Sequence, residues 1–249
     1  PFLTIPPALG HSVIEVPSLH GDAYPGGWTL DLDGIKAGLE AGAGLVILCN
    51  PWNPVGRVLT EVEMRALQEL VSRYDALVFS DEIHSPLVLG GRDFVSYARM
   101  GAEFASHTIT ATAATKGWNI AGLPNAQVII PDEGLRERWD CICQEKLPHS
   151  MSTIGALGSI EAYTNGDEWQ REVFEVIEGN IRTASEALAS TKIDFHPPQA
   201  TYLTWWGFEA YPQFGDSPAS VLLERAHIAV NAGITLGANY SKWARMNLA

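Results

Sequence analysis

The chain has 249 residues, of which 46% are hydrophobic, so it can bury a substantial core as one large domain or two smaller ones. Its 16 basic and 29 acidic residues give a net charge of −13 without a basic cluster, which argues against a nucleic acid or an anionic membrane surface as partner. No apolar run approaches the roughly 20 residues that a membrane span needs.

The three cysteines indicate a reducing compartment. Cys49, Cys141 and Cys143 are odd in number and have no disulfide-framework spacing, which predicts free thiols and a cytoplasmic protein. The Cys-x-Cys pair lies inside a helical pattern, where we do not expect it to bind a metal. We therefore expect no metal site.

The first hundred residues alternate predicted strands with predicted helices. We expect strands at 12–16, 45–49 and 76–79, the second buried on both faces because it is continuously apolar. Residues 30–41 predict a short helix that ends in glycines. Thr60 and Glu63 form a capping box that begins another helix, with apolar residues three and four positions apart: Met64, Leu67, Leu70, Val71 and Tyr74. This alternation predicts a mostly parallel sheet with helices on both sides.

Further strands are expected at 108–110 and 126–130, and the pattern then becomes helical. Residues 133–146, 153–163 and 167–189 predict three helices, of which the last is long. Beyond them, residues 202–206 and 242–248 predict strands, and residues 218–227 predict a helix capped by Ser217.

Three polar motifs each follow a predicted strand. They are Asn50-Pro51-Trp52-Asn53-Pro54-Val55-Gly56, Ser80-Asp81-Glu82-Ile83-His84, and Thr115-Lys116. Ligands of open α/β sheets bind beyond the carboxyl ends of the strands, which is where all three motifs fall. A lone lysine is most often a solvated surface charge, but the small and apolar neighbours of Lys116 favour a partly buried amine that could act as a nucleophile.

In this order the motifs resemble the fold-type I pyridoxal-phosphate enzymes of the aspartate aminotransferase superfamily, class I/II. The Asp-Glu-Ile-His form and the segment Lys-Gly-Trp-Asn-Ile-Ala-Gly-Leu are most similar to the cystathionine β-lyase, or cysteine C–S lyase, branch. The resemblance covers essentially the whole chain. It implies an α/β fold: a three-layer α/β/α large domain with a mostly parallel sheet over residues 1–178, and a smaller C-terminal α+β domain over 179–249. It also implies that both domains are incomplete, with a sizeable portion before Pro1 and a final helix after Ala249.

The resemblance assigns a role in binding pyridoxal 5'-phosphate to several residues. Lys116 would hold the cofactor covalently and act as general base, Asp81 would face the pyridine nitrogen, and Asn53 would donate to the phenolate oxygen. Asn50 would form the turn. Asp81 and Asn53 each have an ordinary alternative role outside cofactor binding, because Asp after a strand often caps a turn and Asn before Pro often forms one.

Further roles follow from the same resemblance. Ile83 would pack on the ring, His84 would lie near its phenolate side, and Thr115 would contact the phosphate. Arg245 would bind the substrate α-carboxylate through its planar fork. A histidine beside a buried strand is more often structural, and an edge-strand arginine can be a surface charge. The chain departs from the family pattern at Ala113 and Pro124, where many members place a hydroxyl and an arginine that hold the phosphate; Thr112 is a further candidate substitute.

Three functions remain open on this basis. The first is a C–S β-lyase that converts L-cystathionine or cysteine S-conjugates to pyruvate, ammonia and a thiol. The second is an aminotransferase on the same scaffold, and the third is a non-catalytic regulator or degenerate paralogue. The resemblance implies a small amino acid as substrate and a homodimer as the assembly.

Overall fold

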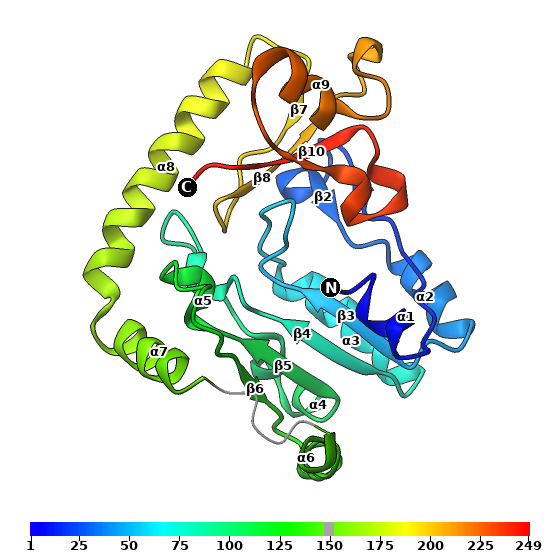
Figure 1. The fold of residues 1–249 in the computed structure, drawn as a ribbon. Coiled ribbons are helices and arrows are strands. Elements are labelled where there is room, and N and C mark those ends of the chain that lie inside the picture. Colours follow the sequence, from blue (N-terminus) through cyan, green and yellow to red (C-terminus); the bar gives the residue numbers. More distant parts are fainter. Residues whose placement is uncertain (147–151) are drawn as a thin grey trace.

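The computed structural model describes residues 1–146 and 152–249, and it contains a larger and a smaller four-stranded sheet, with one long helix that runs alongside both (Figure 1). The larger sheet has three parallel strands and one antiparallel edge strand. Its order is β3 (Leu45–Cys49), β4 (Leu77–Asp81), β5 (Thr108–Thr112) and β6 (Gln127–Ile129). The prediction of an α/β fold with a mostly parallel sheet is confirmed.

Two helices cover one face of β3 and β4, because each has a single apolar stripe. They are α2 (Leu32–Glu40) and α3 (Glu61–Arg73). The predicted capping box begins α3: the Thr60 hydroxyl accepts from the Glu63 backbone, and the Glu63 carboxylate accepts from the Thr60 backbone. The α3 stripe and the inward residues of β3 and β4 form the main core, which contains Leu39, Leu48, Leu59, Met64, Leu67, Val71, Ala76, Val78, Tyr97 and Phe104.

The structure differs from prediction at two places near β3. Residues 12–16 form no regular secondary structure, since none of the described strands pairs with them. Their side chains are largely exposed. Within β3 only Leu48 is buried, and Leu45 is 47% exposed, so the expectation of burial on both faces is wrong for the described chain. A short ribbon of β1 (Leu19–His20) and β2 (Trp28–Thr29) follows the irregular segment.

The smaller sheet is antiparallel throughout. Its order is β7 (Asp194–Phe195), β8 (Leu203–Gly207), β10 (Trp243–Asn247) and β9 (Asn231–Ala232), with α9 (Pro218–Ala226) leading into β9. Ser217 precedes α9 as predicted, but its hydroxyl bonds to the Ser220 hydroxyl and caps no backbone N–H.

The helix α8 (Asp167–Leu188) runs past both sheets (Figure 1). Ile177 and Ile181 are buried on its inner side against Leu89 from the larger part and Tyr202 and Leu248 from the smaller sheet. The helix passes the predicted domain boundary near Gly179 without a break, and that boundary stays a prediction.

The remaining helices are α1 (Ile5–Ala8), α4 (Ala102–Ala105), α5 (Ala114–Gly117), α6 (Glu133–Lys146) and α7 (Thr153–Asn165). The helix α6 carries Cys141 and Cys143 as free thiols. Among the residues that the structure describes, no helix is both long enough and apolar enough to span a bilayer.

Candidate active site

The three sequence motifs meet at one edge of the larger sheet. The strands β3, β4 and β5 are parallel, and their registers pair Cys49 with Asp81 and Asp81 with Ala111. The loop after β3, the turn after β4 and α5 therefore start from the same edge, which faces the smaller sheet (Figure 1). This is the edge at which open α/β sheets bind ligands.

Asp81 is the last residue of β4 and is half-buried. Its Oδ1 accepts a hydrogen bond of 3.2 Å from the Ile83 backbone N–H. Burial raises the pKa of the Asp81 carboxyl, while the Ile83 hydrogen bond and the charge of Lys116 act in the opposite direction. Asp81 and Lys116 thus influence each other electrostatically, yet among the described residues neither takes part in a salt bridge.

Lys116 lies on α5, the single helical turn that follows β5. Gly117 lets this turn pack closely, because a Cβ there would lie 2.7 Å from Cβ of Pro86. The Trp118 indole donates to the Gly166 carbonyl (3.0 Å) and holds the turn against the start of α8, and Gln170 of α8 donates to the carbonyl of Pro86 (3.0 Å), the residue on which Gly117 packs. The position of the Lys116 backbone is therefore set by packing and not by the loop alone.

His84 is buried, being only 3% exposed, and its Nδ1 has no hydrogen-bond partner among the described residues. Burial lowers the pKa of His84 to about 4, and the positive charges of Lys116 and Arg245 add to this effect. The ring meets Tyr202 edge to face, with centroids 6.5 Å apart. At neutral pH His84 is therefore an uncharged imidazole that is close enough to Lys116 and Arg245 to sense their charges.

Arg245 projects from β10 of the smaller sheet and contacts the loop after β3. Its Nη1 donates to Asn53 Oδ1 (3.1 Å) and its Nη2 to Asn231 Oδ1 (3.0 Å), whereas its buried Nε has no partner in the described part of the chain. Burial lowers the pKa of the Arg245 guanidinium, which nevertheless stays charged, and Tyr202 opposes the shift. Arg245 thus keeps one donor for a further acceptor.

The loop that carries Asn53 is fixed at both ends. Asn50 is fully buried and accepts a hydrogen bond of 3.0 Å from the Leu59 backbone, consistent with the turn role predicted for it. The Gly56 carbonyl accepts from the backbone N–H groups of Gln199 and Ala200 (2.7 and 2.9 Å), which connects the loop to the segment before β8. A Cβ at Gly56 would collide with Pro198, so this contact requires glycine.

Sequence reasoning named Glu82 and Glu63 but missed most of the partners of these two carboxylates. Glu82 Oε1 accepts hydrogen bonds from the hydroxyls of Ser80 (2.9 Å) and Ser96 (3.0 Å) and from the Tyr97 backbone (3.1 Å). Glu63 forms a two-bond pair of 2.7 Å each with Arg57, which is 1% exposed. Alternation along β4 could have placed Ser80 and Glu82 on one side of the strand, but nothing in the sequence marks Ser96 as their partner.

Cys49 and Tyr202 also border the site and were not predicted to do so. Burial, together with the charge of Asp81, raises the pKa of the Cys49 thiol to about 12, so Cys49 remains a neutral thiol. Strand register would have revealed Cys49 as a neighbour of Asp81, whereas Tyr202 comes from a segment with no motif.

The other predicted residues have fewer contacts with the side chains described above. Ile83 donates its backbone N–H to Asp81 and is half-buried, and Thr115 is buried next to Lys116 in the chain. Ala113 is buried and offers no hydroxyl, and Thr112 donates to the Glu82 carbonyl over 3.4 Å. The structure brings together Asp81, Lys116, His84, Asn53 and Arg245, but it leaves the predicted phosphate contacts without support.

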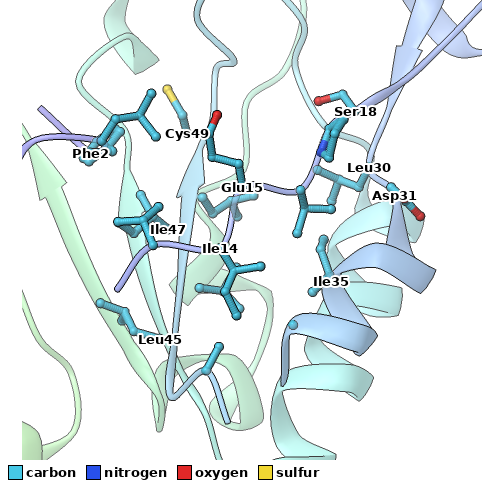
Figure 2. A pocket seen from close by; sticks show the side chains of 18 of the residues that line it. Phe2, Ile14, Glu15, Ser18, Leu30, Asp31, Ile35, Leu45, Ile47 and Cys49 are labelled. Carbon is cyan, nitrogen blue, oxygen red and sulfur yellow. The ribbon is translucent and has the colours of Figure 1, made fainter. Parts of the chain in front are cut away.

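A cavity of about 850 Å³ lies beside this site and not within it. Figure 2 shows it over the open face of β3, where Ile14 lies near Ile47 and Leu45, Cys49 lies at the upper end of the strand, and Ile35 of α2 lies on the other side. Its lining is mainly apolar and touches the site only at Cys49 and the loop that carries Asn53. It lacks the acid, base and cationic fork found at the sheet edge, so the sheet edge is the candidate active site.

Known proteins share this arrangement of the chain. The family model for aminotransferase class I and II matches residues 11–249. Cystathionine β-lyase of Corynebacterium glutamicum is 31% identical over 249 residues, which are 100% of this chain and 64% of that protein. A PLP-bound structure from Clostridium difficile 630, described as an aminotransferase, matches 100% of this chain and 64% of its own with a TM-score of 0.90 and 30% identity.

A third similarity is to cystalysin of Treponema denticola, whose structure contains pyridoxal 5'-phosphate. The TM-score is 0.89 and the identity 26%, over 96% of this chain and 61% of cystalysin. The chain thus spans a little under two thirds of the length of these relatives.

Proposed function

The chain belongs to the aminotransferase class I and II family, and we propose that it is part of a pyridoxal-phosphate-dependent C–S β-lyase. The proposed reaction removes a thiol from Cβ of L-cystathionine or a cysteine S-conjugate, consumes one water molecule and leaves pyruvate and ammonia. The similarity to the C. glutamicum cystathionine β-lyase supports this choice within the family. We also propose a cytoplasmic location, for which the free thiols are the support.

The observation that carries the proposal is the relationship between Asp81 and Lys116. A carboxylate and an amine interact across the sheet edge without forming a salt bridge in the described chain. Pyridoxal phosphate has a ring nitrogen that pairs with a carboxylate and an aldehyde that reacts with an amine, so it fits between them. The unpartnered, buried Nδ1 of His84 and Nε of Arg245 fit a polar ligand in the same space.

Each residue would make a defined contribution. Asp81 would hold a proton on the pyridine nitrogen, and Asn53 would donate its amide N–H to the ring oxygen while its own oxygen accepts from Arg245. The substrate carboxylate would accept hydrogen bonds from Arg245, including its free Nε, and this would fix the orientation of the Cα–H bond. His84, kept neutral by burial, would border the ring without adding positive charge.

Bound pyridoxal phosphate supplies an electron sink for the electron pair left at Cα. Lys116 would remove the Cα proton as general base, because its backbone is held at the rim where both the Asp81 carboxylate and the Arg245 fork converge. In a lyase the thiolate then leaves from Cβ, and a proton is returned to it. In an aminotransferase the Cβ–S bond would stay intact, and Lys116 would return the proton to a different atom so that the amino group can pass to a keto acid.

An aminotransferase is the second candidate, and the similarity to the C. difficile structure described as one favours it. The two candidates differ in their need for an amino-group acceptor. Incubating the protein with L-cystathionine, with and without a 2-keto acid, separates them. Release of pyruvate and thiol without the keto acid supports the lyase, whereas consumption of L-cystathionine that strictly requires the keto acid supports the aminotransferase. If L-cystathionine is consumed under neither condition, the result supports a non-catalytic relative.

We further propose a homodimer, and the outer face of α7 supports it. Ile154, Leu157 and Ile160 lie three residues apart on this face and are 67%, 62% and 62% exposed. A two-fold contact between copies of α7 would bury this stripe. In sedimentation velocity experiments the unchanged protein should sediment as a dimer and the Leu157→Asp variant as a monomer. If the unchanged protein is also a monomer, the proposal is contradicted.

A further inference from the structure

A second cluster of ligand-bearing side chains lies away from the candidate active site, where the β1–β2 ribbon meets the smaller sheet. His20 ends β1, and Asp194 and His196 come from β7 and the residue after it. One ligand atom from each of the three residues lies within 4.8 Å of the others. His20 and Asp194 are 174 residues apart in the chain, so the cluster joins two distant segments.

The ring of His20 has a defined orientation. Its Nδ1 lies 2.7 Å from the Gly27 carbonyl oxygen, which can only accept, so Nδ1 carries the proton. The other nitrogen, Nε2, lies 2.5 Å from Asp194 Oδ2. A ring nitrogen without a proton and a carboxylate oxygen are both acceptors, and they need a cation between them: a second ring proton or a metal ion.

The second histidine favours the metal ion. His196 Nε2 lies 3.5 Å from Asp194 Oδ1, longer than the 2.7–3.2 Å of a good hydrogen bond. A proton on His20 would satisfy the pair of His20 and Asp194 and leave His196 without a close partner. A metal ion bound to all three would satisfy all three, and a ligating histidine commonly donates its other N–H to a backbone carbonyl, as His20 does to Gly27.

The surrounding residues hold these ligands in place. The His20 ring stacks on Trp28 with centroids 4.1 Å apart, and it meets Trp243 edge to face at 5.2 Å. Gly27 has a φ of +76°, and a Cβ at this position would collide with the His196 ring, so only glycine allows the imidazole to lie there. The side chains of His20, Asp194 and His196 are 25%, 37% and 23% exposed, which leaves a path for an ion.

We propose that His20, Asp194 and His196 bind a divalent first-row transition metal, with zinc as the preferred ion, that connects the β1–β2 ribbon to β7. Two imidazoles and one carboxylate suit zinc, whereas calcium and magnesium prefer sets of oxygen ligands alone. Tetrahedral bonds of about 2.0–2.2 Å place the donors roughly 3.3 Å apart, so the 2.5 Å separation of His20 and Asp194 widens when the ion binds. Water takes the fourth position, with Asp22 at the rim, 3.9 Å from His196 Nε2.

Zinc titration of chelator-treated protein, with pyridoxal phosphate present, tests the site by calorimetry. Binding of Co²⁺, followed by its visible absorption, gives a second measure that does not depend on activity. We expect one Zn²⁺ per chain, with affinity at least tenfold lower in His196→Ala and in Asp194→Asn. His11→Ala, which removes an exposed imidazole outside the cluster, is the matched control and should bind as tightly as the unchanged protein.

Asp194→Asn preserves the shape of the side chain and removes only its charge, so weaker binding in this variant should not result from misfolding. Far-UV circular dichroism verifies that each variant is folded. The proposal is overturned if the folded protein takes up no Zn²⁺, or if Asp194→Asn binds Zn²⁺ and Co²⁺ as tightly as the unchanged protein does.

Discussion

Arg245 and Asn53 are 192 residues apart in the chain, yet Nη1 of Arg245 donates a hydrogen bond of 3.1 Å to Oδ1 of Asn53. This bond connects the central strand β10 of the smaller sheet to the loop that leaves β3 of the larger one. In the proposed enzyme, one of these residues holds the substrate and the other the cofactor. Their contact therefore couples the position of the substrate carboxylate to that of the cofactor ring.

Arg245→Lys should weaken substrate binding more than cofactor binding. Lysine keeps the positive charge but lacks the planar fork that bonds to Asn53, Asn231 and a carboxylate together. We expect KM for L-cystathionine to rise about tenfold or more, with the affinity for pyridoxal phosphate changed by less than about twofold, as steady-state kinetics and cofactor titration would show. The control is Arg225→Lys, at an exposed position on α9. An unchanged KM in Arg245→Lys would mean that another group binds the carboxylate.

Asp81→Asn should slow the chemical step while the cofactor still attaches to Lys116. The replacement has nearly the same shape but cannot hold a proton on the pyridine nitrogen, so we expect turnover to fall by about a hundredfold or more. Exchange of the substrate Cα proton with solvent deuterium, followed by NMR, measures this step directly. Asp93→Asn changes an exposed aspartate and should leave the rate as it was. Equal exchange rates in all three proteins would show that Asp81 does not face the ring nitrogen.

Local signals predicted most of the fold, because they depend on neighbours in sequence. The capping box of Thr60 and Glu63 and the apolar stripe of α3 lie within one helix, and both are confirmed. The strand expected at 12–16 has the right residues, but a strand also needs a pairing partner, and none of the described strands provides one. Local pattern alone could not reveal that.

The part of the candidate site that lies at the ends of strands was predictable from the sequence. Asp81 and Lys116 both lie beyond or at the ends of adjacent parallel strands, so topology alone brings them to one edge. The partners of Glu82 and the ligands around Asp194 come from segments without a shared motif. Such contacts depend on how separate elements pack, which the sequence pattern does not specify.

Glu63→Gln should destabilise the fold and remove part of its acid sensitivity. Burial opposes ionisation of Glu63, but hydrogen bonds from Arg57 and Thr60 outweigh it and lower its pKa from 4.5 to about 2. The ionised carboxylate therefore stabilises the fold above pH 4.5, and this contribution of about 3 kcal/mol is lost as the pH falls towards 2.

The substitution leaves the buried Arg57 without its counter-charge, so the free energy of unfolding should fall by about 3–5 kcal/mol at pH 7. Glutamine still completes a capping box, so the change isolates the charge. Glu61→Gln, which removes an exposed pair with Arg65 at 3.7 Å, should change stability by no more than about 0.5 kcal/mol. Urea denaturation of both variants at pH 7 provides the comparison, and equal losses would contradict the assigned role of Glu63.

His84 should make the fold less stable between pH 6.5 and pH 4. Its pKa is about 4 in the folded protein against an ordinary value of 6.5, so the unfolded chain binds the extra proton first as the pH falls. The resulting loss, at most about 3 kcal/mol, is complete below pH 4 and absent above pH 6.5. His84→Phe should flatten the dependence of the unfolding free energy on pH in this window, as denaturant titrations at several pH values would reveal. An unaltered slope would show that His84 is protonated in the folded protein.

The central claim is that Lys116 holds pyridoxal phosphate at the edge of the larger sheet. Borohydride reduction of the cofactor-loaded protein, followed by proteolysis and mass spectrometry, identifies the attached lysine. The account predicts a phosphopyridoxyl label on Lys116, with Lys116→Ala unlabelled there and unable to release thiol from L-cystathionine. A stoichiometric label on another lysine, such as Lys36 or Lys242 in their surface ion pairs, would contradict it.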